Sequence, residues 1–423
     1  MTETATTHER TLDYAQEMDR VDPLAEYRDE YYIPKDNQGN DLMYFTGNSL
    51  GLQPKSTFRM IKQELKDWQT YAVEGHVEAT YPWYSYHEMF AEPESRVVGA
   101  KPIEVVVMNT LTTNLHLMMV SFYRPTQERY KIVIEENAFP SDRYAVASQA
   151  RFHGYDPKDA VVELKPRDGE NTIRTEDIEE FLARDGEQIA LVMLGGVNYY
   201  TGQAFEMDRI TAAGHAKGCL VGFDLAHGAG NLLLNLHDWN VDFAVWCTYK
   251  YMNSGPGGVS GCFVHERHAF NPELPRFAGW WGNDPATRFE MPSEFVPHRG
   301  AGGWQLSNAQ ILPMAAHWAA LQLFDRVGMK GLREKSEKLT GFLEHLLQGN
   351  EGFEILTPKD PTQRGCQLSI RIGGNAKRIV GELQNKGVIA DYRGPEVIRV
   401  APVPMYNTFE DVWRFVEVLQ KFV

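Results

Sequence analysis

The sequence predicts an α/β protein whose larger domain carries a doubly wound, mainly parallel sheet and whose smaller domain is α+β. Apolar runs of strand length begin near residue 100 and alternate with helical patterns, which is typical of parallel sheets. The runs are β-branched and nearly continuous, as expected for strands that helices bury on both faces. The chain has 423 residues, more than one hydrophobic core usually holds, so a second domain is expected.

Six apolar runs are the predicted strands of the larger domain. They lie at residues 103–109, 130–136, 188–196, 219–224, 241–247 and 258–265. Helical patterns fall between them at residues 111–123, 142–152, 175–184 and 207–217. Thr175 precedes Glu176 and Asp177, so we expect it to be the N-cap of the third helix.

A long helical pattern at residues 307–328 leads out of the larger domain. After it, helical and strand patterns follow one another at residues 330–348, 352–358, 366–372, 375–387, 397–402 and 408–422. This succession predicts a small α+β domain at 326–423 and a large domain at 47–325. Residues 1–46 contain no sheet pattern of their own, so we expect them to pack on the small domain.

The bulk composition excludes several functional classes. Hydrophobic residues make up 43% of the chain and charged residues 23%, which is enough apolar material for a folded core. The formal net charge is −15 and the basic residues are scattered, so we expect no nucleic-acid partner. The apolar stretch at 311–324 is too short to span a membrane and contains His317 and Gln322.

The amino terminus and the cysteines predict a cytoplasmic protein. The first residues are polar and acidic and lack the apolar segment of a secretory signal. The cysteines show no CxxC spacing and lie in or near apolar runs; they are Cys219, Cys247, Cys262 and Cys366. We expect them to be buried and reduced.

The carboxyl ends of two neighbouring predicted strands carry a carboxylate and a lysine. Asp224 ends one strand, His227 follows three residues later, and Lys250 ends the next strand, 26 residues after Asp224. Open α/β sheets bind ligands at this edge. Pyridoxal phosphate needs such a pair, because the lysine forms a Schiff base with its aldehyde and the carboxylate keeps its ring nitrogen protonated.

Other strand ends supply the remaining parts of such a site. Phe139 can stack on the cofactor ring. Leu111, Thr112 and Thr113 open a predicted helix, whose N-terminal amides and hydroxyls suit a phosphate. Tyr249 adds a phenol beside the lysine. Together these residues predict a pyridoxal phosphate site.

Residues 222–268 resemble the core of the kynureninases, which are fold-type-I, aminotransferase-like pyridoxal phosphate enzymes that cleave L-kynurenine to anthranilate and L-alanine. Further segments with this resemblance are 44–55, 137–145, 165–178, 199–203, 278–284, 305–312 and 398–412. The resemblance implies a mainly parallel seven-stranded sheet in the large domain and a hydrolase of tryptophan catabolism. It also implies a homodimer whose active site is shared between subunits.

The resemblance assigns roles to particular residues. It implies that the cofactor is bound by Leu111, Thr112, Phe139, Ser141, Asp142, Asp224, His227, Tyr249, Lys250, Trp280 and Asn308, of which Trp280 and Asn308 come from the second subunit. It implies that the substrate is bound by Arg399, His76, Asn308 and Asn48. An arginine fork such as that of Arg399 binds a carboxylate bidentately. Lys250 would shuttle the α-proton, and we expect Tyr249 to act as a general acid or base with a depressed pKa.

One position departs from the family pattern. Relatives carry a serine before the glycine at the end of the third predicted strand, residues 188–196, whereas this chain has Gly195. We therefore expect a hydroxyl contact to the cofactor to be lost, or replaced by backbone or water. The preference for kynurenine or 3-hydroxykynurenine stays open.

Three other interpretations deserve comparison. Residues 265–268, HERH, lack the histidine spacing of a metalloprotease helix, so we interpret them as a solvated turn rather than a metal site. Residues 227–232 lack the third glycine of a dinucleotide fingerprint. Cys366 suggests a cysteine desulfurase or lyase of the same fold, although its apolar surroundings favour a structural thiol. A non-catalytic scaffold of this fold is the remaining alternative.

Overall fold

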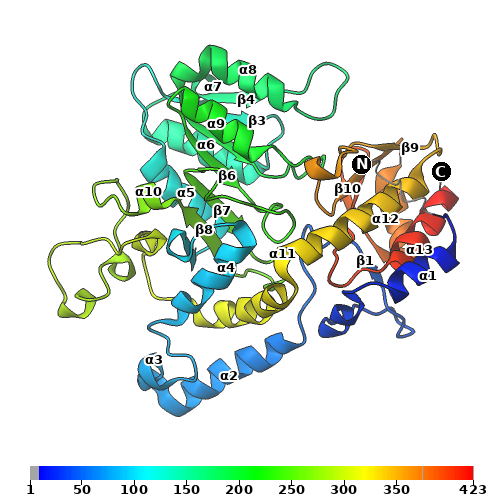
Figure 1. The fold of residues 1–423 in the computed structure, drawn as a ribbon, viewed down its shortest axis with the longest axis horizontal. Helices are drawn as coiled ribbons and strands as arrows, with labels where there is room; N and C mark the ends of the chain where they lie inside the picture. The colour runs from blue at the N-terminus through cyan, green and yellow to red at the C-terminus, as the bar shows by residue number, and fades with distance from the viewer. Residues whose placement is uncertain (1–8, 374, 423) are drawn as a thin grey trace, which may run out of the picture.

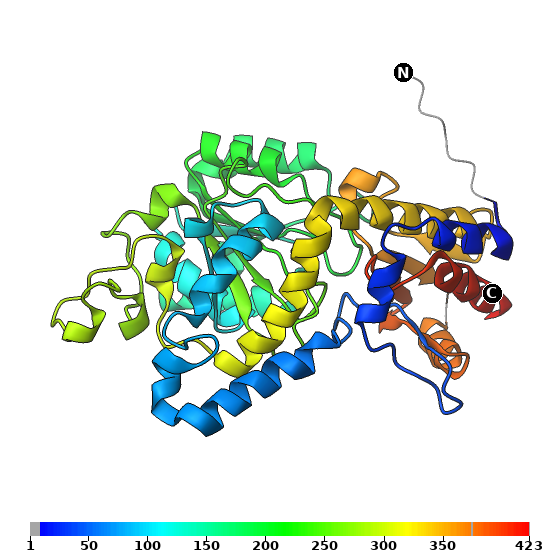
Figure 2. The same cartoon turned by 60° about the horizontal axis from the view of Figure 1, so that its bottom comes forward.

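The structure, a computed structural model, describes residues 9–373 and 375–422. A large lobe is built around a seven-stranded sheet, and a smaller lobe contains both ends of the described chain (Figure 1). Turned by 60°, the molecule shows the amino-terminal helix α1 (Leu12–Arg20) beside the carboxyl-terminal helix α13 (Phe409–Leu419) (Figure 2).

The large sheet is mainly parallel, which confirms the predicted fold type. Its strand order is β2-β8-β7-β6-β5-β3-β4. Only β8 runs antiparallel to its two neighbours. The strands are β2 (Val105–Met108), β3 (Lys131–Glu135), β4 (Val161–Leu164), β5 (Ile189–Gly195), β6 (Leu220–Asp224), β7 (Phe243–Cys247) and β8 (Ser260–Val264). Edge strand β4 was not predicted, because it is short and three of its four residues are only partly buried.

Helices cover the sheet on both faces (Figure 1). In the large lobe they are α2 (Ser56–Tyr71), α3 (Gly75–Glu78), α4 (Ala91–Val98), α5 (Leu111–Phe122), α6 (Pro140–Phe152), α7 (Pro157–Ala160), α8 (Thr175–Asp185), α9 (Met207–Ala216) and α10 (Glu266–Ala269). The four predicted crossover helices are confirmed as α5, α6, α8 and α9. The prediction for Thr175 is wrong: Arg174 is the N-cap of α8, and Thr175 is the first helical residue.

The longest helix, α11 (Ile311–Leu347), runs from the large lobe into the small one (Figure 1). Gly328 interrupts it with a φ of 74° and a ψ of 148°. This backbone conformation favours glycine, because a side chain would be strained there. The break lies just beyond residue 325, where the sequence predicts the domain boundary; that division stays a prediction.

The small lobe contains an antiparallel four-stranded sheet of order β12-β13-β10-β9. Its strands and helix are β9 (Phe353–Ile355), β10 (Leu368–Ile372), α12 (Ala376–Asn385), β12 (Asp391–Arg393) and β13 (Val397–Val400). A parallel pair, β1 (Met43–Tyr44) with β11 (Val388–Ile389), joins the amino-terminal segment to this lobe. Asp19 of α1 accepts hydrogen bonds from the first amides of α13, at Phe409 and Glu410.

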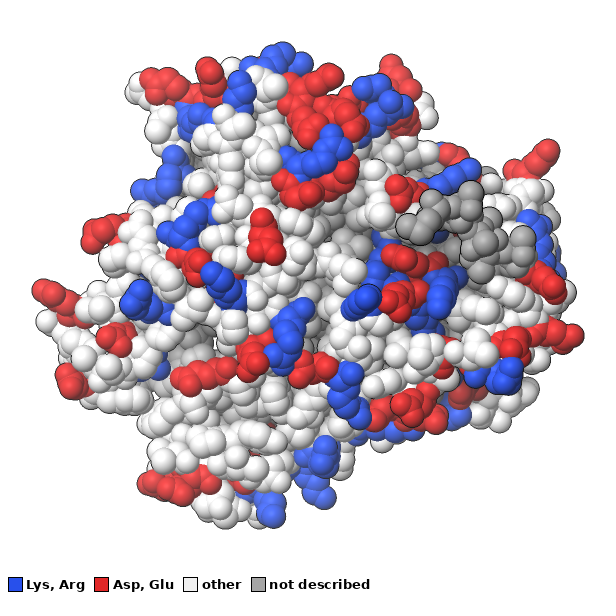
Figure 3. All heavy atoms as spheres, in the orientation of Figure 1, with Lys and Arg blue, Asp and Glu red and all other residues white. Residues whose placement is uncertain are grey.

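The distribution of surface charge and the state of the cysteines agree with the expectations from the sequence. Acidic and basic side chains are interspersed over the face seen in Figure 3. All four cysteines are free and buried, which confirms that prediction. None of the described helices combines the length and the apolar content needed to cross a bilayer.

Candidate active site

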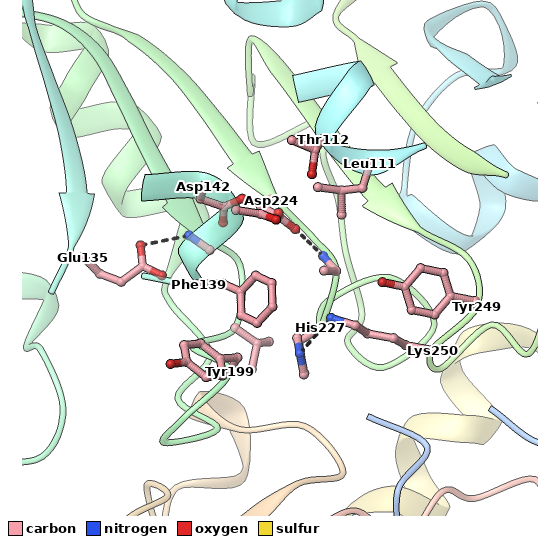
Figure 4. A pocket seen from close by; sticks show the side chains of 14 residues that line it. Leu111, Thr112, Glu135, Phe139, Asp142, Tyr199, Asp224, His227, Tyr249 and Lys250 are labelled. Carbon is pink, nitrogen blue, oxygen red and sulfur yellow. Dashed lines mark hydrogen bonds between the residues drawn. The ribbon is translucent and has the colours of Figure 1, made fainter. Parts of the chain in front are cut away.

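A pocket lies at the carboxyl edge of the large sheet, where the segments that follow β2, β3, β5, β6 and β7 meet (Figure 4). Its lining residues are Leu111, Thr112, Glu135, Phe139, Ser141, Asp142, Gly195, Val197, Tyr199, Asp224, Ala226, His227, Tyr249 and Lys250. Nine of the predicted cofactor residues are therefore neighbours, although they come from four separate parts of the chain. Their roles stay predictions, but the common location follows from the parallel strand directions.

Lys250 points into this pocket from the end of β7 (Figure 4). Its Nζ lies 3.1 Å from Nε2 of His227 and 5.8 Å from the centre of the Phe139 ring. Burial, followed by the positive charge of Lys250, holds the pKa of His227 well below its usual range. His227 is therefore a neutral imidazole beside the amine, and its buried Nδ1 has no partner.

Three buried carboxyl groups, those of Glu135, Asp142 and Asp224, share one end of the pocket (Figure 4). Burial raises the pKa of Asp224, although the Ala226 amide donates to its Oδ1 at 2.7 Å. Burial, and then the charge of Asp224, raises the pKa of Asp142 well above its usual range. Of the two neighbouring acids, Asp142 is therefore the one that holds a proton more readily.

The depressed pKa predicted for Tyr249 depends on a cationic cofactor beside the phenol and stays a prediction; the protein alone shifts this pKa the other way. Burial, followed by the neighbouring Cys247 and the charge of Asp224, raises the pKa of this phenol. A half-buried phenol without a cationic neighbour loses solvation when it ionises. Tyr249 is therefore protonated here and is suited to donate a proton rather than to accept one.

Arg399 lies at the boundary between the two lobes. It is 1% exposed and is ion-paired with Asp391 on the adjacent strand β12; Nε lies 2.9 Å from Oδ2 of Asp391. Its Nη1 donates to the carbonyl oxygen of Tyr199 at 2.7 Å. Tyr199 lines the pocket, and its ring meets Phe139 edge-on at 5.3 Å. The guanidinium is thus next to the pocket without lining it.

Asn48 is connected to the same place through one more side chain. It is fully buried, and its Nδ2 donates to Oε1 of Gln367 at 2.7 Å. Gln367 in turn donates from Nε2 to the Tyr199 carbonyl at 3.1 Å. The Oδ1 of Asn48 has no partner. Asn48 therefore lies behind the pocket wall rather than in it.

The single chain does not bring His76, Trp280 or Asn308 to the pocket. His76 on α3 packs against the rings of Trp83 and Tyr84. Trp280 is 41% exposed and donates from Nε1 to the carbonyl of Arg288. Asn308 is exposed in the segment before α11. Their assignment to a shared site between two subunits stays a prediction.

Two polar side chains that line the pocket were not predicted from the sequence, those of Glu135 and Tyr199. Glu135 ends β3 just as Asp224 ends β6, so reading every strand end for acids would have found it. Glu135 lies beside Gly195 and its carboxyl group occupies the neighbouring space; the expected loss or replacement of a hydroxyl contact to the cofactor stays a prediction. A Cβ added at Gly195 would lie 2.9 Å from Oε1 of Glu135.

The other interpretations meet different outcomes. The solvated turn at residues 265–268 is wrong for His265, which is 8% exposed and accepts the Arg267 amide as the N-cap of α10. Its Nδ1, with the side chains of Glu104 and His237, forms a compact cluster at the opposite edge of the sheet. Cys366 is buried away from the pocket, and burial raises the pKa of its thiol to about 11.

Comparisons with known proteins agree on one family. Residues 332–419 match the family described as the kynureninase C-terminal domain. The kynureninase of Myxococcus xanthus is 58% identical, and the match covers 96% of each chain. That of Koribacter versatilis is 55% identical over 99% of each chain. That of Nematostella vectensis is 48% identical over 96% of this chain and 93% of its own.

Solved structures share the fold at low sequence identity. The apo cysteine desulfurase of Thermococcus onnurineus has a TM-score of 0.77 at 17% identity, covering 94% of this chain and 97% of its own. A C-DES mutant with glycine covalently linked to its PLP cofactor has a TM-score of 0.76 at 17% identity, covering 89% and 96%. At this identity the likeness shows the fold alone.

Proposed function

The chain belongs to the kynureninase family, and we propose that it hydrolyses the Cβ–Cγ bond of L-kynurenine or 3-hydroxykynurenine. The products are anthranilate or 3-hydroxyanthranilate and L-alanine, and the cofactor is pyridoxal 5′-phosphate. The observation that carries this proposal is the full-length similarity to kynureninases, which reaches 58% identity over 96% of the chain.

The residues of the pocket fit this cofactor. Two buried polar atoms on its wall, Oδ1 of Asp142 and Nδ1 of His227, have no partner and can bind a polar ligand. The amino end of α5, at Leu111 and Thr112, faces the pocket with free amides that suit a phosphate. The amine of Lys250 and the carboxylate of Asp224 complete the set of groups that this cofactor requires.

Bound pyridoxal phosphate supplies an electron sink for the substrate carbanion, and the chain supplies the proton transfers and the positioning. Asp224 would hold the protonated ring nitrogen of the bound cofactor by its charge. Lys250 removes the α-proton with its ε-amine, and the neutral His227 beside Nζ adds no competing positive charge. Tyr249, whose phenol is protonated in the protein alone, would serve as the general acid or base for the γ-carbonyl of the substrate.

Arg399 is the proposed partner of the substrate carboxylate. A guanidinium carries five N–H donors. Asp391 accepts from Nε and Nη2, and the Tyr199 carbonyl accepts from Nη1. One N–H on each terminal nitrogen is left, which is the pair needed for a bidentate carboxylate. Asp391 and Tyr199 therefore orient the guanidinium and leave two of its N–H groups for the substrate.

We propose a homodimer in which a second copy supplies Trp280 and Asn308, with His76 near the substrate ring. Support comes from the apolar side chains on and after α2, because Trp68, Val73 and Val77 are each more than half exposed. The cytoplasm is the proposed compartment, since all four thiols are free. Sedimentation of the protein as a monomer with full activity would contradict the shared site.

Neither alternative function is favoured. A cysteine desulfurase needs a reactive thiolate, whereas Cys366 is buried outside the pocket and its pKa is raised to about 11. A scaffold protein would have no need of Asp224 and Lys250 in one pocket.

Turnover of kynurenine and 3-hydroxykynurenine tests the proposal. We expect the purified protein with pyridoxal phosphate to release alanine and the matching anthranilate. Lys250→Ala should lower the rate by at least about 10⁴-fold, as for other groups that transfer the reacting proton. Lys131→Ala, at the opposite edge of the same sheet, is the matched control and should keep the parent rate.

Two results would overturn the proposal. One is the absence of turnover of both substrates by protein that binds the cofactor. The other concerns the chosen lysine: borohydride should fix the cofactor covalently to the parent and not to Lys250→Ala.

A further inference from the structure

We propose that Glu135 is a positioning residue for Asp224, and that the side chain of Glu135 requires glycine at position 195. The inference deepens the proposed function, on which it rests, because it concerns the partner of the cofactor's ring nitrogen. It is carried by a hydrogen bond, a shared volume and the charges of the same pocket.

Glu135 is connected to Asp224 through hydrogen bonds at the carboxyl end of β5. The side chain of Glu135 is 3% exposed, and its Oε2 accepts the amide N–H of Gly195 at 3.1 Å (Figure 4). Gly195 lies opposite Asp224 in the β5–β6 register. The next amide, that of Gly196, donates to the carbonyl oxygen of Asp224 at 2.7 Å. Glu135 therefore fixes the backbone on which the position of Asp224 depends.

Glu135 and a side chain at position 195 would compete for one volume. The 2.9 Å between a Cβ at Gly195 and Oε1 of Glu135 is shorter than real Cβ contacts allow. The carboxyl group is the far end of a flexible side chain, so it would move rather than the backbone. Moving it breaks its bond to the Gly195 amide. A larger residue at 195 thus acts on Asp224 by displacing Glu135.

The charges in the pocket explain why an acid is tolerated there. Glu135, Asp142 and Asp224 all lie in the pocket with Lys250 as the only cation among its lining residues. A protonated ring nitrogen is balanced by one carboxylate, and a further negative charge would compete with Asp224 for it. A neutral Glu135 still accepts the Gly195 amide through its carbonyl oxygen. The residue can therefore position Asp224 without acting as a rival anion.

Cofactor binding to the cofactor-free protein tests this inference without any substrate. The dissociation constant of pyridoxal phosphate is measured from its absorbance and from tryptophan fluorescence for Glu135→Gln and Glu135→Ala. Glu135→Gln keeps the shape and the acceptor, so we expect a change of less than about threefold. Glu135→Ala removes a bond to a buried amide, so we expect the constant to rise about tenfold or more.

Gly195→Ser in two backgrounds gives the sharper result. In the parent we expect it to raise the dissociation constant about tenfold, because it displaces Glu135. In Glu135→Ala the space is free, so the same change should add less than about twofold. Additive effects of the two substitutions, or parental affinity in Glu135→Ala, would overturn the inference.

A spectroscopic readout separates positioning from general stability. The pH midpoint of the bound cofactor's absorbance reports the contact between Asp224 and the ring nitrogen. We expect this midpoint to shift in Glu135→Ala and in Gly195→Ser, and to equal the parent value in Glu135→Gln. An unmoved midpoint in all three would also overturn the inference. If Glu135→Ala does not fold, the midpoint and affinity of Gly195→Ser against Glu135→Gln decide alone. Since no kynurenine is used, failure here leaves the turnover test of the proposed function unaffected.

Discussion

The two edges of the large sheet treat a buried aspartate in opposite ways. Asp224 ends β6 at the carboxyl edge and is 6% exposed, whereas Asp242 precedes β7 at the amino edge and is 1% exposed. Only 18 positions separate them in the chain. Their burial is similar, so the difference between them comes from the groups that surround each carboxyl.

Asp242 is surrounded by donors. His215 and His268 lie 2.9 and 2.6 Å from its oxygens, Arg267 lies at 2.5 Å, and the Val221 amide donates at 2.6 Å. Burial alone would raise its pKa, but the bonds from the two histidines and the charge of Arg267 hold the pKa well below its usual range. Asp242 is an anion whose hydrogen bonds are complete within the protein.

Asp224 has the Ala226 amide and a second acid, Asp142, as its neighbours, and burial raises its pKa. A buried acid that lacks donors costs stability unless a ligand completes its bonds. The amino edge is therefore organised for folding and the carboxyl edge for binding. This division is typical of active sites, where perturbed pKa values accumulate.

The largest expected effect on this comparison comes from Asp242→Asn. Removing one partner of a buried ion pair costs about 3–5 kcal/mol of unfolding free energy. Urea unfolding at pH 7 measures this loss. Asp224→Asn in the cofactor-free protein is the matched variant. It should lose less than about 1 kcal/mol of unfolding free energy, since the charge of Asp224 is poorly compensated in the parent. Equal losses in the two variants would break the distinction between the edges.

The depressed pKa of Asp242 also predicts how the stability of the fold changes as the pH falls. Its folded pKa is depressed, so its contribution is present above its unfolded pKa of about 3.9 and is lost as the pH falls through and below that value. The stability difference between parent and Asp242→Asn should therefore shrink on acidification.

Glu135 should give an effect of intermediate size and of the opposite sign. Burial, opposed by its backbone bonds, raises its pKa from 4.5 to about 7. A raised folded pKa contributes stability below pH 4.5 that is lost as the pH rises through 7, on the order of 3 kcal/mol for a shift of this size. In the cofactor-free state, Glu135→Gln should therefore gain stability over the parent between pH 5 and pH 8. A stability difference that is the same at both pH values would contradict the burial of an ionisable group.

The smallest expected effect is that of Asp391→Asn on the substrate-binding arginine. Losing the ion pair loosens Arg399, and we expect the KM for kynurenine to rise about tenfold with little change in kcat, as for a group that binds ground and transition states alike. Glu354→Gln is the control, because its pair with Arg371 is exposed on the same small sheet. A fall in kcat at constant KM would instead place Asp391 in the chemistry.

The sequence predicts most of what depends on strand direction. Lys250 and Asp224 could be found because parallel strands bring their carboxyl ends to one edge whatever the register. Glu135 could be found in the same way, but its contact with Gly195 could not, since that contact requires β3 to neighbour β5, a long-range pairing that local patterns do not contain. The raised pKa of Tyr249 in the protein alone could not be predicted, because it depends on Cys247 and on the burial around the phenol.

Contacts across the boundary between the lobes could not be predicted from the sequence either. The bond from Arg399 to the Tyr199 carbonyl joins parts of the chain 200 positions apart, and neither residue carries a pattern that predicts the other. His76, Trp280 and Asn308 were named from family resemblance alone, and the single chain gives no geometry that would have suggested them.

The carbonyl of Tyr199 receives hydrogen bonds from both Arg399 and Gln367, and it belongs to the main chain. Every amino acid presents the same carbonyl, so no substitution at position 199 can delete this acceptor. A substitution at position 199 can therefore change one side chain of the pocket wall while the join between the lobes persists. That join depends on the side chains of Arg399 and Gln367 and not on the ring of Tyr199.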